Sequence, residues 1–204
     1  MIVGGALLPH PPIILPRYAA QRGSEVDDTI AAVQRACGWL AAVAPDRIVI
    51  SSPHLGHGFD VPLWFVRVRM GGLPPVERVL TDDPSYARYR DLGRELRARE
   101  KEMLGGAVVI ASGDLSHRLR PEGPYGFHEL GPKLDEAIVA GVRSADPEAL
   151  LAIDPEVIEE GAECGLRSFI FGLSALAPAR AEVLSYQGPY GVGYMVATLD
   201  PVRS

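Results

Sequence analysis

The sequence predicts an α/β fold with a mostly parallel β-sheet flanked by helices. Two observations support this prediction: three short apolar runs end in loop-forming residues, and segments with helical spacing separate the runs. The runs span residues 2–8, 47–50 and 107–111. Alternating strands and helices indicate βαβ units, in which the carboxyl ends of the strands meet at one edge of the sheet. Each run is closely followed by a histidine, so we expect these histidines to gather at that edge.

The first part of the chain reads as one βαβ unit. Residues 2–8 form a strand that ends in the segment Pro9-His10-Pro11-Pro12. Prolines restrict φ, so this loop holds His10 in one orientation. Apolar residues recur at helical spacing over residues 24–43, and two aspartates near the start complement the helix dipole. The strand at residues 47–50 then completes the unit.

The middle of the chain adds further elements before the third run. Residues 61–70 alternate partly between apolar and polar side chains, which favours an additional strand. Residues 77–80 indicate another short strand. Residues 83–103 predict a helix, with Pro84 in its first turn and a charged, solvent-facing side.

The last part of the chain follows the third run with a loop and then alternates helices and strands. Residues 119–132 are rich in proline and glycine and come directly after His117, so this loop is expected to act as a lid or pocket wall. Helices are predicted at 134–142, 147–153 and 163–176, and strands at 181–186 and 192–199. The length of 204 residues fits one domain, 1–204, without an interdomain linker.

Composition excludes several classes of function. The formal net charge of −6 and the absence of a Lys/Arg cluster argue against a nucleic-acid partner. No apolar run reaches the roughly 18 residues that a membrane-spanning helix needs, so no membrane association is expected. Two cysteines favour a reducing, cytoplasmic environment over a disulfide scaffold. For the oligomeric state, a symmetric homodimer is the default expectation.

His10 and His54 are the strongest candidate metal ligands. Each closes a strand beside a proline, and neutral imidazole binds Fe, Zn and Cu. A third ligand is expected from Glu163 or Cys164 but not from both, because neighbouring helical side chains diverge by roughly 100°. Glu163 would complete a facial triad, and Cys164 would make a softer site for Zn or Cu(I). The structural alternatives are that Glu163 complements a helix dipole and that Cys164 is a small buried apolar residue.

Asp114 and His117 follow the third strand and are candidates for catalysis. His117 suits general acid/base chemistry, whereas Asp114 is equally suited to a turn. Further candidates for substrate binding are expected around the site, each with an alternative role in packing or at the surface. These residues are His57, His128, Tyr125 and Tyr190.

Four short motifs resemble the class III extradiol dioxygenase superfamily, the type of the catalytic subunit of protocatechuate 4,5-dioxygenase, and the related Memo-like proteins. They are LLPHPP, SSPH, SGDLSH and AECGLRS, in the order found in that superfamily. The resemblance implies a three-layer α/β sandwich with a central mixed sheet. In the dioxygenases it implies Fe(II) held by residues matching His10, His54 and Glu163, and an acid/base histidine matching His117. In the Memo-like proteins a cysteine before glycine takes the third ligand position, which Cys164 matches.

Two functions follow as expectations. The first is a non-haem Fe(II) extradiol dioxygenase that opens a catechol-like aromatic diol with O2. The alternative is a Memo-like metal-binding protein without ring cleavage, acting through binding, redox chemistry or a partner protein. A zinc hydrolase is a third, weaker interpretation. The expected cofactor is Fe(II), with Zn or Cu as alternatives, and the expected partners are a small aromatic substrate and O2.

Overall fold

The computed structural model describes residues 1–176 and 179–201 and contains one six-stranded sheet in the order β3-β2-β4-β1-β6-β5. β1 to β4 run parallel to one another, while β6 is antiparallel to β1 and β5 is antiparallel to β6. The predicted mixed, mostly parallel sheet is therefore confirmed. The strands are β1 (Ile2–Leu8), β2 (Arg47–Ser52), β3 (Val76–Leu80), β4 (Ala107–Ser112), β5 (Ala179–Gln187) and β6 (Tyr194–Pro201).

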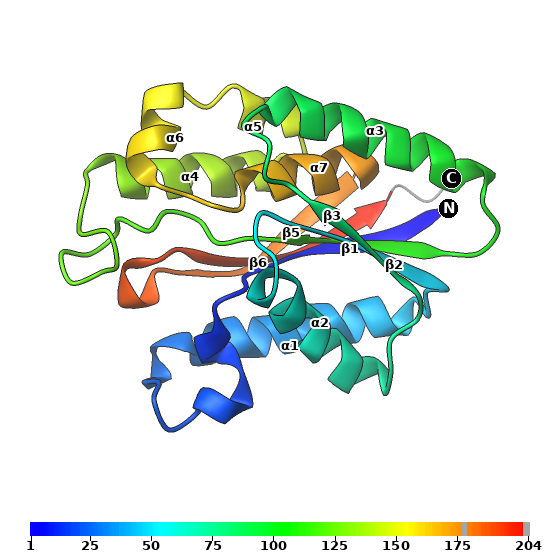
Figure 1. The fold of residues 1–204 in the computed structure, drawn as a ribbon, viewed down its shortest axis with the longest axis horizontal. Coiled ribbons are helices and arrows are strands. Elements are labelled where there is room, and N and C mark those ends of the chain that lie inside the picture. The colour runs from blue at the N-terminus through cyan, green and yellow to red at the C-terminus, as the bar shows by residue number, and fades with distance from the viewer. Residues whose placement is uncertain (177–178, 202–204) are drawn as a thin grey trace.

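Helices cover both faces of the sheet and make three layers (Figure 1). α1 and α2 lie on one face of the sheet, and α3 to α7 lie on the side of its opposite face. The helices are α1 (Asp27–Ala42), α2 (His57–Met70), α3 (Tyr86–Glu102), α4 (Leu130–Arg143), α5 (Pro147–Leu151), α6 (Pro155–Gly161) and α7 (Leu166–Leu176). Short 3-10 turns are η1 (Pro12–Ile14), η2 (Pro16–Tyr18), η3 (Ser24–Val26) and η4 (Pro189–Gly191).

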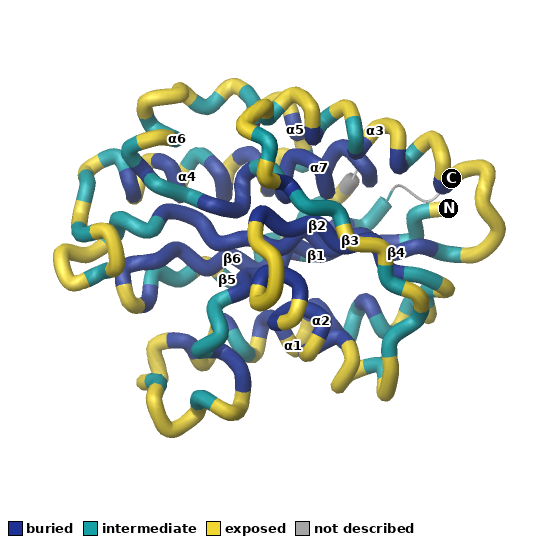
Figure 2. The backbone as a smooth tube through the Cα atoms, viewed as in Figure 1, coloured by how far each residue is buried: buried dark blue, intermediate teal, exposed yellow. Residues whose placement is uncertain are grey.

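The central strands are apolar throughout because both of their faces are buried. In β2, Ile48 and Ile50 pack into the core under α1 and α2, whereas Val49 packs into the core on the opposite side. Figure 2 shows this buried sheet between helices whose outer sides are exposed. Burying one such side chain contributes about 1.5–3 kcal/mol, so the two cores fix the strands firmly. Near-continuous apolar runs are typical of parallel sheets covered on both faces.

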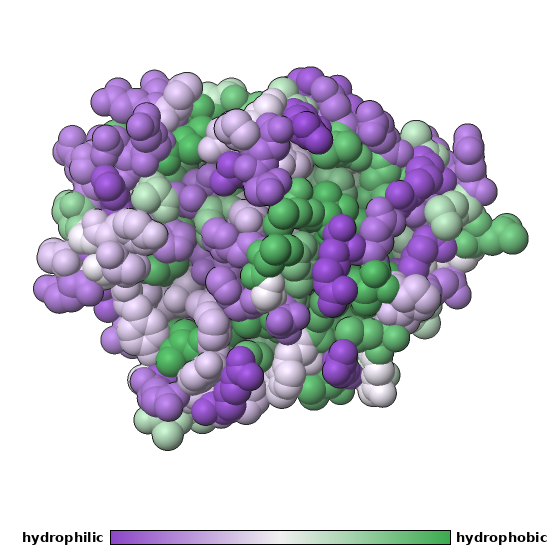
Figure 3. Space-filling model, viewed as in Figure 1, coloured by the Kyte–Doolittle hydropathy of each residue, from purple (hydrophilic) through white to green (hydrophobic). Residues whose placement is uncertain are grey.

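The predicted strand at residues 61–70 is wrong, because this segment belongs to α2. Its buried residues include Val61, Leu63, Phe65 and Val66, which follow the packing side of a helix. The alternation at the end of the segment was misleading, since Val68 is 62% exposed and belongs to no buried strand face. Hydrophobic residues are accordingly exposed over the region of α2 in the view of Figure 3.

Other predicted elements are confirmed with shifted ends. The last predicted helix begins at Leu166 rather than at residue 163, and the predicted helix at 134–142 begins already at Leu130. α6 was not predicted at all. No helix among residues 1–176 and 179–201 is long and apolar enough to cross a membrane.

Candidate metal centre

The carboxyl ends of β1, β2 and β4 meet at one edge of the sheet and bring the histidines together. β4 lies between β1 and β2, and Leu8 is opposite Ser112 in the register. The ring centroids of His10 and His54 are 5.4 Å apart. His57, the first residue of α2, joins them at 5.3 Å from His10 and 5.6 Å from His54. Three imidazoles, one from the segment after β1 and two from the segment after β2, thus form one cluster.

Cys164 supplies a thiol to this cluster. Its Sγ lies 3.6 Å from Nε2 of His10, and the potential ligand atoms of His10, His54 and Cys164 all lie within 4.8 Å of one another. The approach depends on two glycines, because a Cβ on Gly113 would lie only 2.1 Å from Cα of Gly165. Close backbone contact between the ends of β4 and the turn before α7 therefore positions the thiol.

The donor set fits a soft or borderline cation. Zinc binds imidazole nitrogen at about 2.0–2.1 Å and thiolate sulfur at about 2.3 Å, so a tetrahedral site separates the two ligand atoms by about 3.6 Å. The distance from His10 Nε2 to Cys164 Sγ is 3.6 Å. Two imidazoles and a thiolate also suit copper, because sulfur ligands select Cu(I) and Zn.

The hydrogen bonds around His10 set its tautomer. The hydroxyl of Ser112 donates to the carbonyl oxygen of Gly58, so its own oxygen is left to accept from Nδ1 of His10 at 3.0 Å. The Gly58 carbonyl is available because residue 62 of α2 is a proline, which has no N–H to bond the carbonyl four residues earlier. Nδ1 therefore carries the proton, and the lone pair of Nε2 points to Cys164. Such supporting contacts orient metal-binding histidines in general.

Burial sets the protonation states of the cluster. Burial, with the neighbouring His54, His57 and His117, lowers the pKa of His10 to about 3. Burial also lowers the pKa of His54 and raises the pKa of the Cys164 thiol well above its ordinary value. The imidazoles of His10 and His54 are therefore held neutral, the form that binds a cation, whereas the thiol needs a bound cation to lose its proton.

Asp114 and His117 lie beside the cluster. Asp114 Oδ1 accepts the backbone N–H of His10 at 3.0 Å, and burial raises the pKa of the Asp114 carboxyl to about 6. His117 forms a second group with Asp114 and Cys164, again with the potential ligand atoms within 4.8 Å. Nδ1 of His117 is buried and has no hydrogen-bond partner among the described residues. The ring of Tyr125 packs edge-on against His117 at a centroid distance of 5.6 Å.

Three other candidate residues are engaged elsewhere. Glu163 accepts hydrogen bonds from the backbone N–H of Leu166 and from the hydroxyl of Tyr86, so it supports the start of α7. Nδ1 of His128 accepts from the N–H of Leu130, and its Nε2 lies 3.6 Å from Glu160 Oε2. The hydroxyl of Tyr190 accepts the N–H of Gly23 at 3.0 Å.

Two supporting residues were missed from the sequence, Ser112 and Asp135. Asp135 is a buried residue of α4 whose carboxylate accepts the N–H of Ser116 at 2.7 Å and the hydroxyl of Tyr186 at 2.6 Å. It therefore holds the loop between Asp114 and His117. A signal was present, because Asp135 shares the apolar face of its helix with Ile138, and a buried acid there needs partners.

Comparison with known proteins places this chain in a family. Residues 52–197 match the family described as the catalytic LigB subunit of aromatic ring-opening dioxygenase. A relative, Protein CA_C1420 of Clostridium acetobutylicum, is 26% identical over 268 residues, which cover 97% of this chain and 57% of that protein. The chain thus spans a little over half the length of this curated relative.

A solved structure agrees in fold. The uncharacterized protein JW3007 from Escherichia coli K12 superposes with a TM-score of 0.59 at 14% identity, over 96% of this chain and 99% of that one. At this identity the likeness bears on the fold alone. The family match, in contrast, spans well over half of the chain. This chain belongs to the family of catalytic LigB subunits of aromatic ring-opening dioxygenases.

Proposed function

We propose that this chain is a Memo-like metal-binding member of the family, with one Zn²⁺ or Cu(I) ion held by His10, His54 and Cys164 and without ring-cleavage activity. The observation that carries the proposal is that Cys164 Sγ, and not the carboxylate of Glu163, faces Nε2 of His10. A thiolate in place of a carboxylate favours a softer cation than the Fe(II) of a facial triad.

Neighbouring residues can stabilise the thiolate of Cys164 and accept the proton that the thiol loses. The backbone N–H of Asp114 donates to Cys164 Sγ at 3.4 Å, which stabilises negative charge on the sulfur. The Asp114 carboxylate and His117 lie in one group with that sulfur and can accept its proton. When bound, the cation supplies Lewis acidity or, in the case of copper, one-electron redox chemistry.

Extradiol ring opening is the second candidate function, favoured by the family match and by the place of His117 beside Tyr125. In this function Fe(II) would supply the site that orients a catechol-like diol and O2. His117 would take a proton from a hydroxyl of the diol. The exposed aromatic ring of Tyr125 would form part of the wall against which the substrate ring packs.

Metal affinity of two matched variants tests the ligand set. The affinities of wild type, Cys164→Ala and Glu163→Gln for Zn²⁺, Cu(I) and Fe(II) are measured anaerobically by competition with a chromophoric chelator. We expect Cys164→Ala to weaken the affinity for Zn²⁺ and Cu(I) by more than about 100-fold. This loss exceeds the roughly 10–100-fold that is typical when a supporting residue is removed. The affinity of Glu163→Gln should stay within about threefold of wild type, because the amide oxygen can still accept the Leu166 N–H and the amide NH2 can donate to the Tyr86 hydroxyl.

The opposite ranking of the two variants would point to a carboxylate ligand and contradict the proposal. Ring cleavage is assayed separately, by exposing Fe(II)-loaded protein and catechols to air and following the absorbance of ring-opened products. We expect no turnover. Turnover that disappears in His117→Ala while iron is retained would establish the second function instead.

A further inference from the structure

A cavity lies between α1, α2 and the segment that follows His10. Its volume is about 340 Å³, within the range of roughly 300–1,000 Å³ that small-molecule sites occupy. It contains none of the three candidate metal ligands and is therefore distinct from the metal centre. Its lining residues are Ile14, Pro16, Arg22, Ile30, Gln34, Cys37, Trp64, Phe65, Val68 and Arg69.

The walls of this cavity combine apolar side chains with three polar ones, Arg22, Gln34 and Arg69, and are partly open to solvent. Ile14 and Phe65 belong to the buried core beneath it, and Cys37 is 1% exposed. Trp64 is 37% exposed and Val68 is 62% exposed, so they flank the opening. A ligand here would cover apolar surface that now faces water, which is favourable by about 25 cal/mol per Å².

Two guanidinium groups are the only charged groups in the lining, and the lining contains no acid. One amino group of Arg22, Nη1, donates to the carbonyls of Ile13, Ile14 and Leu15 at 3.2–3.4 Å, which fixes this side chain in place. Among residues 1–176 and 179–201, no carboxylate oxygen lies within 4.0 Å of Arg22 or Arg69. Glu25, the acid nearest to Arg22 in the sequence, pairs with Arg120 instead.

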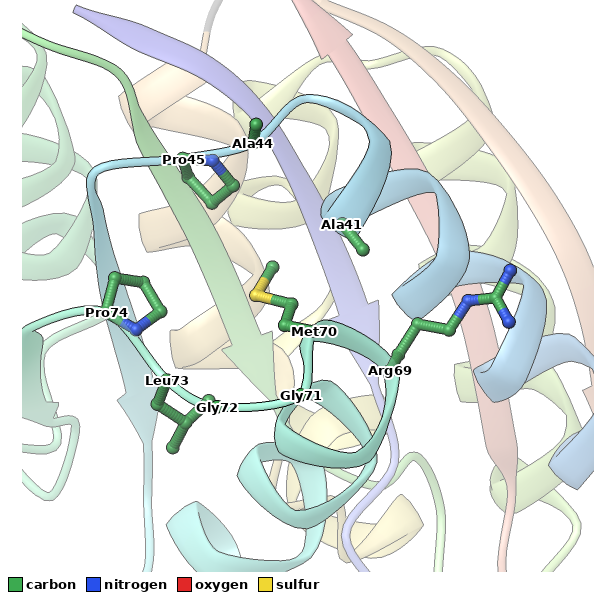
Figure 4. A pocket seen from close by; sticks show the side chains of 9 residues that line it. All are labelled: Ala41, Ala44, Pro45, Arg69, Met70, Gly71, Gly72, Leu73 and Pro74. Carbon is green, nitrogen blue, oxygen red and sulfur yellow. The ribbon is translucent and has the colours of Figure 1, made fainter.

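Arg69 extends toward α1. A Cβ on Gly38 of α1 would lie 3.2 Å from Nε of Arg69, so the guanidinium lies against this glycine. A neighbouring, more open cavity of about 550 Å³ is formed by the α1–β2 and α2–β3 connections. Figure 4 shows the Arg69 side chain extending away from the other residues of that cavity. Arg69 lines both cavities, and its guanidinium lies on the side of α1.

We propose that the α1–α2 cavity binds a small organic acid, with one carboxylate and a compact apolar body. The carboxylate would pair with Arg69 and the free nitrogens of Arg22, since guanidinium groups match carboxylates in geometry and charge. The apolar body would lie against Ile30, Phe65 and Trp64. Because the whole chain carries a net charge of −6, attraction of an anion must arise locally from these two arginines.

Fluorescence of Trp64 tests this site directly. The sequence contains two tryptophans, Trp39 and Trp64, so the Trp39→Phe protein reports on the cavity alone. The probes are 3-phenylpropionate and its uncharged amide, 3-phenylpropionamide. We expect a saturable change with the acid, and at least about tenfold weaker binding of the amide, because a hydrogen bond to a charged group contributes about 1.5–3 kcal/mol.

Three further variants in the Trp39→Phe background locate the acid. Arg69→Gln should weaken binding of the acid at least about tenfold. Arg67→Gln is the matched control, because Arg67 is exposed on the same helix but lies outside the lining, and its affinity for the acid should stay within about twofold of the parent protein. Val68→Asp places a carboxylate at the opening and should abolish binding, and its exposed position spares the fold. Circular dichroism confirms folding of each variant.

Several results would overturn the proposal. One is the absence of a saturable signal up to about 10 mM acid, a concentration beyond the range of weak specific ligands. The others are equal losses of affinity in Arg67→Gln and Arg69→Gln, and unchanged binding in Val68→Asp. Loss of binding in His10→Ala with retention in Arg69→Gln would place the acid at the metal centre and equally refute the second site.

Discussion

At the scale of single residues, His10 is held by contacts on three sides before any cation binds. Its backbone N–H donates to Asp114, its Nδ1 bonds Ser112, and its Nε2 faces Cys164. The proline inside α2 contributes indirectly, because it leaves the carbonyl of Gly58 to the Ser112 hydroxyl. The imidazole is therefore preorganised for binding through Nε2.

Replacing Ser112 tests this arrangement. We expect Ser112→Ala to weaken metal binding by about 10–100-fold, because the His10 ring loses the contact that sets its tautomer and orientation. Chelator competition measures the change. Ser51→Ala is the matched control, since Ser51 is equally buried but its Oγ has no hydrogen-bond partner among the described residues. Equal effects of the two substitutions would argue against a specific role for Ser112.

The buried carboxyl group of Asp135 leads us to predict that the stability of the fold depends on pH. Burial raises the pKa of its carboxyl from 3.8 to about 7 in the folded protein. The folded state then binds the proton more tightly than the unfolded state, so the free energy of unfolding falls as the pH rises from about 4 to about 7. An upper bound for this loss is about 4 kcal/mol.

Asp135→Asn removes this titration while keeping an acceptor for Ser116 and a polar partner for Tyr186. We therefore expect the melting temperature of the wild type to fall relative to that of the variant between pH 4 and pH 8. Differential scanning calorimetry measures both proteins across this range. Parallel curves for the two proteins would show that the buried carboxyl does not contribute.

At the scale of elements, close approach of two backbones builds the site. The loop after β4 touches the turn before α7 at Gly113 and Gly165, where a side chain does not fit. We expect Gly113→Ala to destabilise the fold by about 1–3 kcal/mol, as overpacking does, and to weaken metal binding because Cys164 is displaced. Urea unfolding and chelator competition measure the two effects.

Gly72→Ala is the control for this substitution, because a Cβ there meets nothing within 4 Å. It should change stability by less than about 1 kcal/mol and leave metal affinity unchanged. If Gly113→Ala behaved in the same way, the close approach would not be what positions the thiol.

The elements also show where sequence reasoning succeeds. Strands β1, β2 and β4 were predicted because continuous apolar runs bounded by loop formers have few other interpretations. α2 was missed because the alternation of apolar and charged residues from Val66 to Arg69 resembles that of a strand. Packing against the rest of the core favours a helix for this segment instead. Its true signature was the apolar set of Val61, Phe65 and Val66 on one side of a helix.

At the scale of the whole molecule, the parallel sheet explains why motifs distant in sequence share one edge. His10, His54 and Asp114 follow three adjacent strands, which the order of apolar runs and histidines indicates without coordinates. The sequence left open whether Glu163 or Cys164 faces the histidines, because this depends on where α7 begins. The helix starts at Leu166, so Glu163 reaches forward to its first N–H while Cys164 lies in the preceding turn, facing His10.

X-ray absorption spectroscopy of the zinc-loaded protein tests the proposed centre most directly. We expect one sulfur ligand at about 2.3 Å together with imidazole nitrogens at about 2.0–2.1 Å, and loss of the sulfur shell in Cys164→Ala. A first shell containing only nitrogen and oxygen in the wild type would contradict a centre built on His10, His54 and Cys164.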